Sequence, residues 1–138
     1  MEYPNDVDLV WLAVDETDRL AAVVTGGSGP IPEQVLINDD DDVLGIERAL
    51  LALPSIGAAS VHAQVPNPQS FKALSERGLF VYDWTDVHRV RSAEIGAYEL
   101  VASPSVTLSL ADLPIGLRRL VAPVDRGALL GALTLRVS

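Results

Sequence analysis

Two short apolar segments near the start of the chain, separated by a polar turn, most constrain the fold. Residues 8–14 and 19–25 are rich in strand-forming side chains, and 15–18 has the polar composition of a hairpin turn. Because both segments are apolar on both faces, we expect the two strands in the middle of a sheet or beneath helices on both sides. Trp11 is then predicted to be a core residue.

The remaining sequence predicts a mixture of helices and strands. A Gly- and Pro-rich turn at 26–32 ends the hairpin. Apolar spacing and breaker residues predict helices over 43–53, 68–78 and 112–120, and strands over 59–65, 79–84, 97–102, 105–110 and 129–137. A chain of 138 residues with 49% apolar side chains is long enough for one packed core. We therefore predict a single α+β domain over 1–138, with a mostly antiparallel five- to six-stranded sheet and about three helices.

Several classes of protein are excluded or disfavoured by composition. The chain contains no Cys, so disulfide scaffolds, thiol catalysis and thiolate metal sites are excluded. The first eight residues are acidic and lack the apolar run of a signal peptide. The longest uncharged stretch, 49–71, contains three prolines and polar side chains, and is not expected to span a membrane. We expect a cytoplasmic protein.

The negative charge of the chain is concentrated in its first third. Residues 1–48 carry 12 acidic and 2 basic side chains, while the formal net charge of the whole chain is −9. Nucleic acid is not an expected partner, because its binding depends on Lys and Arg that neutralise phosphates. An acidic surface favours a basic protein partner. The alternative interpretation is that these charges serve solubility alone.

Four consecutive aspartates, Asp39, Asp40, Asp41 and Asp42, precede the helix predicted over 43–53. One carboxylate can accept hydrogen bonds from the first N–H groups of the helix, while the others complement the positive end of its dipole. A weak cation site and an acidic docking patch are the alternatives. An EF-hand loop is excluded, because the positions that require Gly and Glu hold other residues.

A second candidate site follows the strand predicted over 79–84. Tyr, Trp and Arg often carry the binding energy of protein interfaces, and this segment contributes Tyr82, Trp84, Asp86, His88 and Arg89. The alternative is that the two aromatic side chains cover one end of the core. If the strand continued, Asp86 and His88 would point to one face, where with Asp83 they would form a small metal or acid–base cluster.

Other motifs point to no defined chemistry. The loop at 26–30 is Gly-rich, but it lacks the Lys of a phosphate-binding loop, and Pro30 removes a backbone donor. Its Gly-Gly-Ser-Gly sequence also lacks the spacing of a serine nucleophile elbow. His62 and His88 lie 26 residues apart, outside the close spacing typical of zinc sites. We therefore predict no catalytic residue, no metal site and no cofactor.

Two stretches resemble a group of known proteins. They are Asp8–Asp15, continuing through the hairpin to Thr25–Pro32, and Gly78–Asp86, together about a quarter of the chain. These stretches resemble small uncharacterised bacterial proteins, some of which are similar to immunity proteins of toxin–antitoxin type loci. The resemblance implies binding of a protein toxin and supplies no catalytic residues.

The sequence thus favours a non-enzymatic domain that binds a basic protein, with an immunity-like role as its sharpest form. Two other function classes remain open. One is a small-ligand or metal-assisted enzyme that uses Asp83, Asp86 and His88. The other is a self-assembling subunit whose last apolar strand, 129–135, forms a shared edge.

Overall fold

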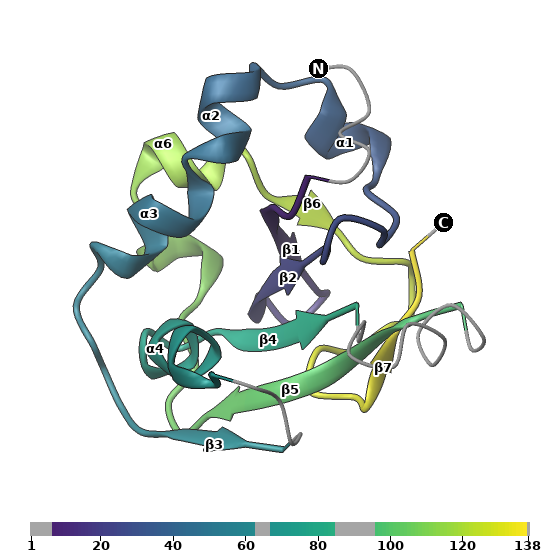
Figure 1. Ribbon diagram of the computed structural model, residues 1–138. Helices are drawn as coiled ribbons and strands as arrows, with labels where there is room; N and C mark the ends of the chain where they lie inside the picture. The colour runs from purple at the N-terminus through teal and green to yellow at the C-terminus, as the bar shows by residue number, and fades with distance from the viewer. Residues whose placement is uncertain (1–6, 63–66, 85–95, 138) are drawn as a thin grey trace.

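The structure is a computed structural model that describes residues 7–62, 67–84 and 96–137. It contains one curled sheet with helices packed around it (Figure 1). The strands are β1 (Val10–Val14), β2 (Leu20–Val24), β3 (Ala59–Val61), β4 (Phe80–Asp83), β5 (Tyr98–Pro104), β6 (Ala122–Pro123) and β7 (Thr134–Leu135). The helices are α1 (Glu33–Leu36), α2 (Asp40–Leu44), α3 (Ile46–Leu51), α4 (Gln69–Glu76) and α6 (Ile115–Arg118), with a 3-10 turn η1 (Leu110–Asp112). No helix within these ranges has the length and apolar character needed to cross a membrane.

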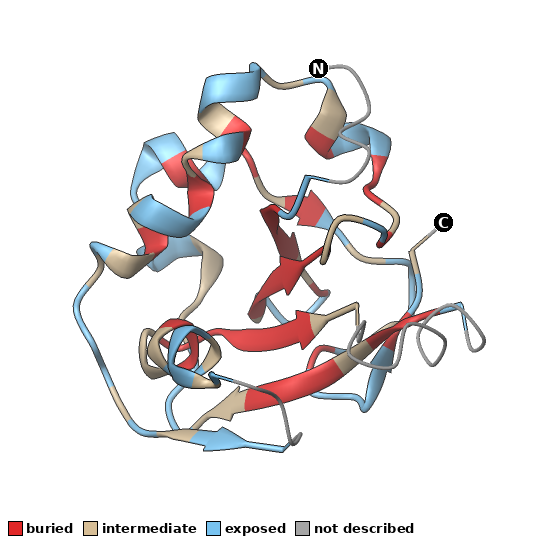
Figure 2. Ribbon diagram, viewed as in Figure 1, coloured by how far each residue is buried: buried red, intermediate tan, exposed pale blue. Residues whose placement is uncertain are grey.

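The β1–β2 hairpin lies in the middle of the sheet, as its apolar sequence predicted. The strand order is β3-β5-β4-β2-β1-β6, and β7 pairs with β5. Every residue of β2 and the first four residues of β1 are buried, because both faces of the hairpin are covered. Trp11 is 1% exposed, which confirms that it is a core residue. Figure 2 shows this buried centre running from β1 and β2 into β4 and β5.

The combination of helices with a sheet is confirmed, but the sheet is mixed. The β1–β2, β3–β5, β4–β5 and β5–β7 pairs are antiparallel, whereas β2–β4 and β1–β6 are parallel. A parallel pair needs a long crossover connection. The chain between β2 and β4 supplies one, since it contains α1 to α4. Pro123 lies on the edge strand β6, where its missing N–H leaves no neighbouring strand without a donor.

The helix predicted over 43–53 is present as two shorter helices. α2 ends at Leu44 and α3 begins at Ile46, so Gly45 is both the C-cap of the first and the N-cap of the second. Glycine has a low helix propensity, which explains why the helix divides there. The apolar stripe is nevertheless preserved, because Val43, Ile46 and Leu50 are all buried. Both helices contact β1.

The helix at 69–76 and the strand after it agree with the prediction. Gly78 ends this segment with a φ of +94°, a conformation that favours glycine. A Cβ atom at Gly78 would lie 2.6 Å from the backbone nitrogen of Leu108, so the close approach of a neighbouring loop also requires glycine. The resulting α4 packs against β3, β4 and β5.

The chain after β5 departs most from the prediction. β5 continues through Ser103 and Pro104, beyond its predicted end at 102, and the strand predicted over 105–110 is replaced by irregular chain that ends in η1. A capping box fixes this end, since Asp112 Oδ2 accepts hydrogen bonds from Ser109 Oγ at 2.8 Å and Ser109 N at 3.3 Å. Of the strand predicted over 129–137, the part that joins the sheet is β7.

The guanidinium of Arg77 fixes α3 against α4. It donates hydrogen bonds to the carbonyl oxygens of Leu51 at 3.0 Å, Leu53 at 3.1 Å and Ala73 at 2.8 Å. The last carbonyls of a helix have no partner within the helix, so this side chain satisfies groups at the end of α3. The α2–α3 pair is therefore held in place beside α6, on the side of the molecule where Figure 1 shows these three helices together.

Candidate functional site

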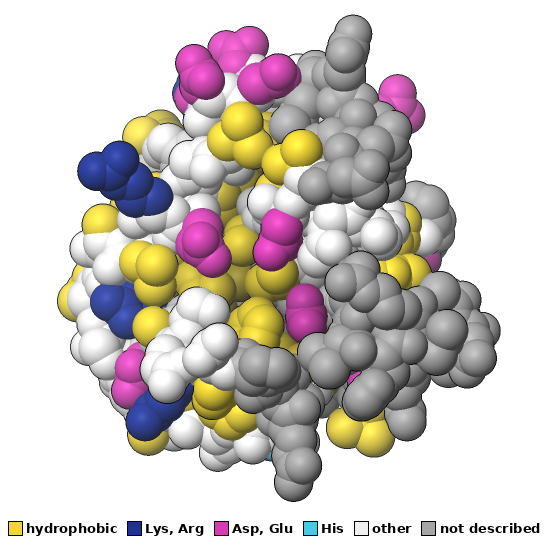
Figure 3. Space-filling view, viewed as in Figure 1, with side chains coloured by type: hydrophobic (Ala, Val, Ile, Leu, Met, Phe, Trp, Pro, Cys, Tyr) yellow, Lys and Arg dark blue, Asp and Glu magenta, His cyan; other side chains and the backbone are white. Residues whose placement is uncertain are grey.

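The four aspartates occupy the start of α2. Asp39 is the N-cap residue, and Asp40, Asp41 and Asp42 form the first turn. The expected side-chain cap is not formed: the Asp39 carboxylate accepts no capping hydrogen bond from the N–H groups of α2. Three of the four side chains are exposed, and Asp42 is half-buried. Figure 3 shows acidic side chains gathered at the top of the view, over α2. The run therefore presents negative charge to solvent.

A groove of about 540 Å³ lies beside this acidic run, between the α2–α3 pair and α6. Its lining is mostly small or apolar and includes Gly45, Ala49, Ala52, Leu53, Leu117 and Leu120. Asp41 and Asp42 also line it, so the negative charge stands at the edge of an apolar depression. A concave apolar surface of this size with a few charged groups is typical of a binding site.

One ion pair connects the two walls of the groove. Arg119 Nη2 lies 3.3 Å from Asp42 Oδ2, and these side chains are 66% and 40% exposed. Exposed pairs of this kind contribute roughly 0–1 kcal/mol to stability, because water screens them and both side chains lose rotamer freedom. The pair between Arg119 and Asp42 therefore adds little to the stability of the fold.

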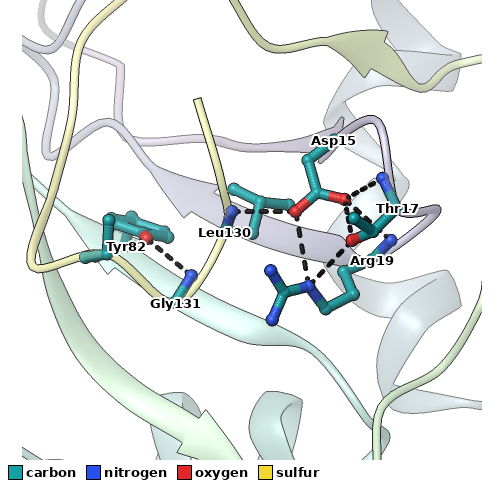
Figure 4. A network of polar contacts seen from close by, with 7 residues as sticks. Asp15, Thr17, Arg19, Tyr82, Leu130 and Gly131 are labelled. Carbon is teal, nitrogen blue, oxygen red and sulfur yellow. Dashed lines mark hydrogen bonds and ion pairs between the residues drawn. The ribbon is translucent and has the colours of Figure 1, made fainter. Parts of the chain in front are cut away.

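A second polar cluster is buried at the opposite end of β1, in the turn of the hairpin (Figure 4). The Asp15 side chain is fully buried. Its Oδ1 accepts hydrogen bonds from Thr17 N at 2.9 Å, Thr17 Oγ1 at 2.7 Å and Arg19 N at 3.1 Å. Its Oδ2 accepts one from Leu130 N at 2.9 Å and lies 3.4 Å from Arg19 Nε. Burial raises the pKa of this carboxyl, but its hydrogen bonds together lower the pKa by a larger amount. The pKa of Asp15 therefore lies below its ordinary value.

Tyr82 continues this cluster toward the C-terminal segment. Its hydroxyl donates to Ala132 O at 2.6 Å and accepts a hydrogen bond from Gly131 N at 3.0 Å. Burial raises the pKa of Tyr82 to about 12, so the hydroxyl stays protonated. Asp15 thus fastens Leu130 to the turn of the hairpin, and Tyr82 fastens Gly131 and Ala132 to β4. This is a structural role.

Sequence reasoning assigned no role to Asp15 beyond the hairpin turn. A signal was present, because an aspartate two residues before a threonine often closes a turn onto the following N–H groups. The contact with Leu130 spans 115 residues of sequence, and no local pattern indicates it.

The second candidate site is divided between the core and residues outside the described ranges. Tyr82 is fully buried, so it belongs to the core, which was the alternative interpretation. Trp84 is half-buried and packs edge-on against Tyr98, with ring centroids 5.1 Å apart. Asp86, His88 and Arg89 lie outside the described residues. Among the residues that are described, no group of three or more His, Cys, Asp and Glu side chains is placed to hold a metal ion.

The glycine-rich loop after β2 forms a hydrogen-bonded turn. Ser28 N and Gly29 N donate to Thr25 O at 3.1 and 2.8 Å, and Gly26 N donates to Asp8 Oδ1 at 3.0 Å. These N–H groups are used within the protein and do not form an anion site. A Cβ atom at Gly29 would lie 2.4 Å from the Tyr98 hydroxyl, so the loop requires a glycine where the aromatic ring approaches it.

Comparisons with known proteins give no relative: no family profile matches the chain, and neither a curated protein nor a solved structure matches it significantly. The groove between α2–α3 and α6 is therefore interpreted from its own residues.

Proposed function

We propose that this protein acts by binding a basic partner protein in the groove between α2–α3 and α6. The observation that carries the proposal is the placement of Asp41 and Asp42 on the wall of a 540 Å³ apolar groove. The occupant is an amphipathic helix of the partner, with apolar side chains in the groove and Lys or Arg toward α2. An immunity-like role in the cytoplasm, in which the groove covers a basic segment of a toxin, is the specific form that the sequence resemblance favours.

The shape of the groove supports a helix as the occupant. Gly45, Ala49 and Ala52 line one wall at spacings close to one helical turn, so little side-chain volume separates a partner from the α2–α3 backbone. Leu53, Leu117 and Leu120 supply apolar surface below them. Helices that bind in grooves insert apolar side chains at positions i, i+3 or i+4, and i+7, and the apolar lining of this groove offers contacts for such side chains.

The charge around the groove supports a basic partner. Asp41 and Asp42 are the acidic residues that line the groove within the described part of the chain. Asp39, Asp40 and Asp41 are exposed beside the groove, and Asp42 faces it in a weak pair with Arg119. Complementary charge accelerates association and orients the partner. An acidic helix would instead meet repulsion along the same wall.

The direct test is an NMR titration of the full chain with a designed amphipathic helical peptide that carries Lys on its polar face. We expect the backbone amide signals of Gly45, Ala49 and Gly116 to move, with the affinity falling as salt rises. A peptide with the same apolar face and Glu in place of Lys is the control for charge. Ala49→Trp fills the groove and is expected to abolish the shifts, whereas Ala58→Trp, at an exposed position before β3, preserves them.

The same two tryptophan variants connect the peptide result to the native partner. A protein captured from the host at low salt, released at high salt and not retained by Ala49→Trp would agree with the proposal. Equal capture by both tryptophan variants would contradict it. A dimer in solution that dissociates in Ala49→Trp would assign the groove to a second copy of the chain and overturn the basic partner.

A further inference from the structure

A separate feature, the outer edge of β3, goes beyond the proposed function. β3 lies at one end of the sheet and pairs with β5 along one side only (Figure 1). Two hydrogen bonds of this pair fix the direction of its peptide groups. His62 N donates to Val101 O at 2.8 Å, and Ser105 N donates to Ala58 O at 2.9 Å. Ala58 and His62 therefore turn their backbone groups toward β5.

The backbone groups of Ala59 and Val61 point the other way. Successive residues of an antiparallel strand direct their N–H and C=O groups to opposite sides. Because residues 58, 60 and 62 face β5, the groups of Ala59 and Val61 point away from the sheet, and no described residue pairs with them. Ser60 is exposed and Val61 is 38% exposed, so this edge of the sheet is open to solvent (Figure 2).

This edge lacks the side chains that usually keep sheet edges apart. Natural edge strands are often protected by charged side chains, especially Lys, or by proline. β3 has the sequence Ala-Ser-Val, and the stretch 49–71 that contains it has no Asp, Glu, Lys or Arg. The paired part of β5 is similar, since 100–111 also has none. Two uncharged segments therefore meet at one edge of a chain whose formal net charge is −9.

The charge of the chain indicates which occupant fits this edge. Copies of a chain with a net charge of −9 repel one another, and the repulsion is weakest where both surfaces are uncharged. A basic or an acidic partner gains no electrostatic attraction from such a surface. Apolar side chains beside the strand supply contact area, because Ile56 and Val106 are 38% and 50% exposed. A second copy of this chain brings the same uncharged edge and the same apolar side chains.

We propose that β3 pairs with β3 of a second copy of this chain, in antiparallel orientation, so that the two sheets join into one. A two-fold axis through Ser60 places Ala59 of each copy opposite Val61 of the other. Each of these pairs exchanges both of its N–H···O hydrogen bonds, so every outward group of the strand gains a partner. The contact is isologous and covers β3 of both copies, so it closes at a dimer. This interface lies in a different segment from the edge expected over 129–135.

Sedimentation equilibrium of the full chain measures the assembly directly. Between about 5 µM and about 500 µM, we expect the mean mass to rise from the 14.7 kDa of the monomer toward twice that value. Amide hydrogen exchange identifies the surface. The N–H groups of Ala59 and Val61 should exchange at least about tenfold more slowly at the higher concentration. The N–H group of His62, which is bonded to β5 within one copy, should be protected at both concentrations.

Val61→Pro is the most specific variant, because it removes an N–H that points away from β5 and breaks no hydrogen bond of the fold. We expect it to weaken dimerisation at least about tenfold, whereas Val61→Thr keeps the N–H and the branched shape and should change it less than about twofold. Val61→Glu places like charges on both sides of the axis and should also weaken dimerisation at least about tenfold. Ile37→Glu, at a 75% exposed position after α1, is the control for added charge. If Val61→Pro does not fold, the two glutamate variants decide.

A chain that stays monomeric at the highest concentration, or a dimer that the Val61 variants leave intact, would overturn the proposal. Ala49→Trp separates the β3 interface from the proposed function, since filling the groove should leave the β3 dimer unchanged. A dimer that dissociates in Ala49→Trp and not in Val61→Glu would lie at the groove and overturn the pairing of β3. Failure of the basic peptide to bind the groove would leave the mass of the β3 dimer as expected.

Discussion

Asp15 and the run from Asp39 to Asp42 use the same side chain in opposite ways. Asp15 is buried in the hairpin turn and accepts hydrogen bonds from Thr17, Arg19 and Leu130. The aspartates of α2 are largely exposed, and their N-cap residue makes no side-chain cap. The first carboxylate is committed to holding the fold together, whereas the others remain oriented toward solvent. Removal of a charge from the exposed run is therefore expected to cost the fold little.

The largest expected effect comes from removing the buried carboxylate. Asp15→Ala leaves the N–H groups of Thr17, Arg19 and Leu130 without their acceptor, and we expect a loss of about 3 kcal/mol in the free energy of unfolding. Asp42→Ala is the matched control and should change it by no more than about 0.5 kcal/mol. Urea denaturation of both variants measures the difference. Equal losses would remove the distinction between the two sites.

The second effect concerns the phenol that continues the Asp15 cluster. Tyr82→Phe keeps the ring but leaves Gly131 N and Ala132 O unpaired, and we expect a loss of about 1.5 kcal/mol. Thermal and urea unfolding provide the measurement, and protease sensitivity after residue 127 reports whether the C-terminal segment loosens first. A variant as stable as the wild type would show that these contacts do not fasten the segment.

A smaller effect is expected from acid. The pKa of Asp15 is lower in the folded chain than in the unfolded one. Its ionisation therefore stabilises the fold at pH values above the ordinary aspartate pKa near 4. That contribution is lost as the pH falls through the lower, folded value. We expect the gap in unfolding free energy between the wild type and Asp15→Asn to narrow from pH 7 to pH 3. A gap that stays constant would mean that the carboxyl has the same pKa in both states.

On the exposed side, changing all four aspartates at 39–42 to asparagine should leave the unfolding free energy within about 0.5 kcal/mol of the wild type. The association rate with the basic amphipathic peptide should fall, while the dissociation rate changes less. Stopped-flow mixing at two salt concentrations measures both rates. An unchanged association rate would show that the acidic run does not contribute to peptide binding in the groove.

The smallest expected effect is at the ion pair across the groove. Arg119→Gln removes the partner of Asp42 and frees that carboxylate for the peptide, so affinity should rise by about twofold to fivefold. Arg118→Gln, one residue earlier, is the control, since Arg118 donates to Ala111 and Leu113 instead. Weaker binding by Arg119→Gln would indicate that the pair helps to form the groove.

Local chemistry explains which parts of this fold could be predicted. The hairpin, α4 and β4 follow from apolar patterns and from Gly78, all of which act over a few residues. The parallel pairing of β1 with β6 could not be predicted in this way, because it joins residues more than 100 positions apart. The acidic run was identified, but the groove beside it was not, since α6 completes its other wall from a distant part of the sequence. Patterns that act over a few residues do not predict contacts between segments that are far apart in the sequence.

The hydrogen bond between Asp15 and Leu130 also has a consequence for folding during synthesis. The hairpin is synthesised early. Leu130, whose N–H donates a hydrogen bond to the buried carboxylate of Asp15, is synthesised 115 residues later. Gly127 N, which donates to Glu16 Oε1 at 3.2 Å, arrives equally late. Until these donors are present, burying the Asp15 carboxylate would leave it short of hydrogen bonds, which is unfavourable. Closure of the core around the hairpin turn therefore waits for the last part of the chain. A chain interrupted before this point would keep its central hairpin open to quality-control proteases.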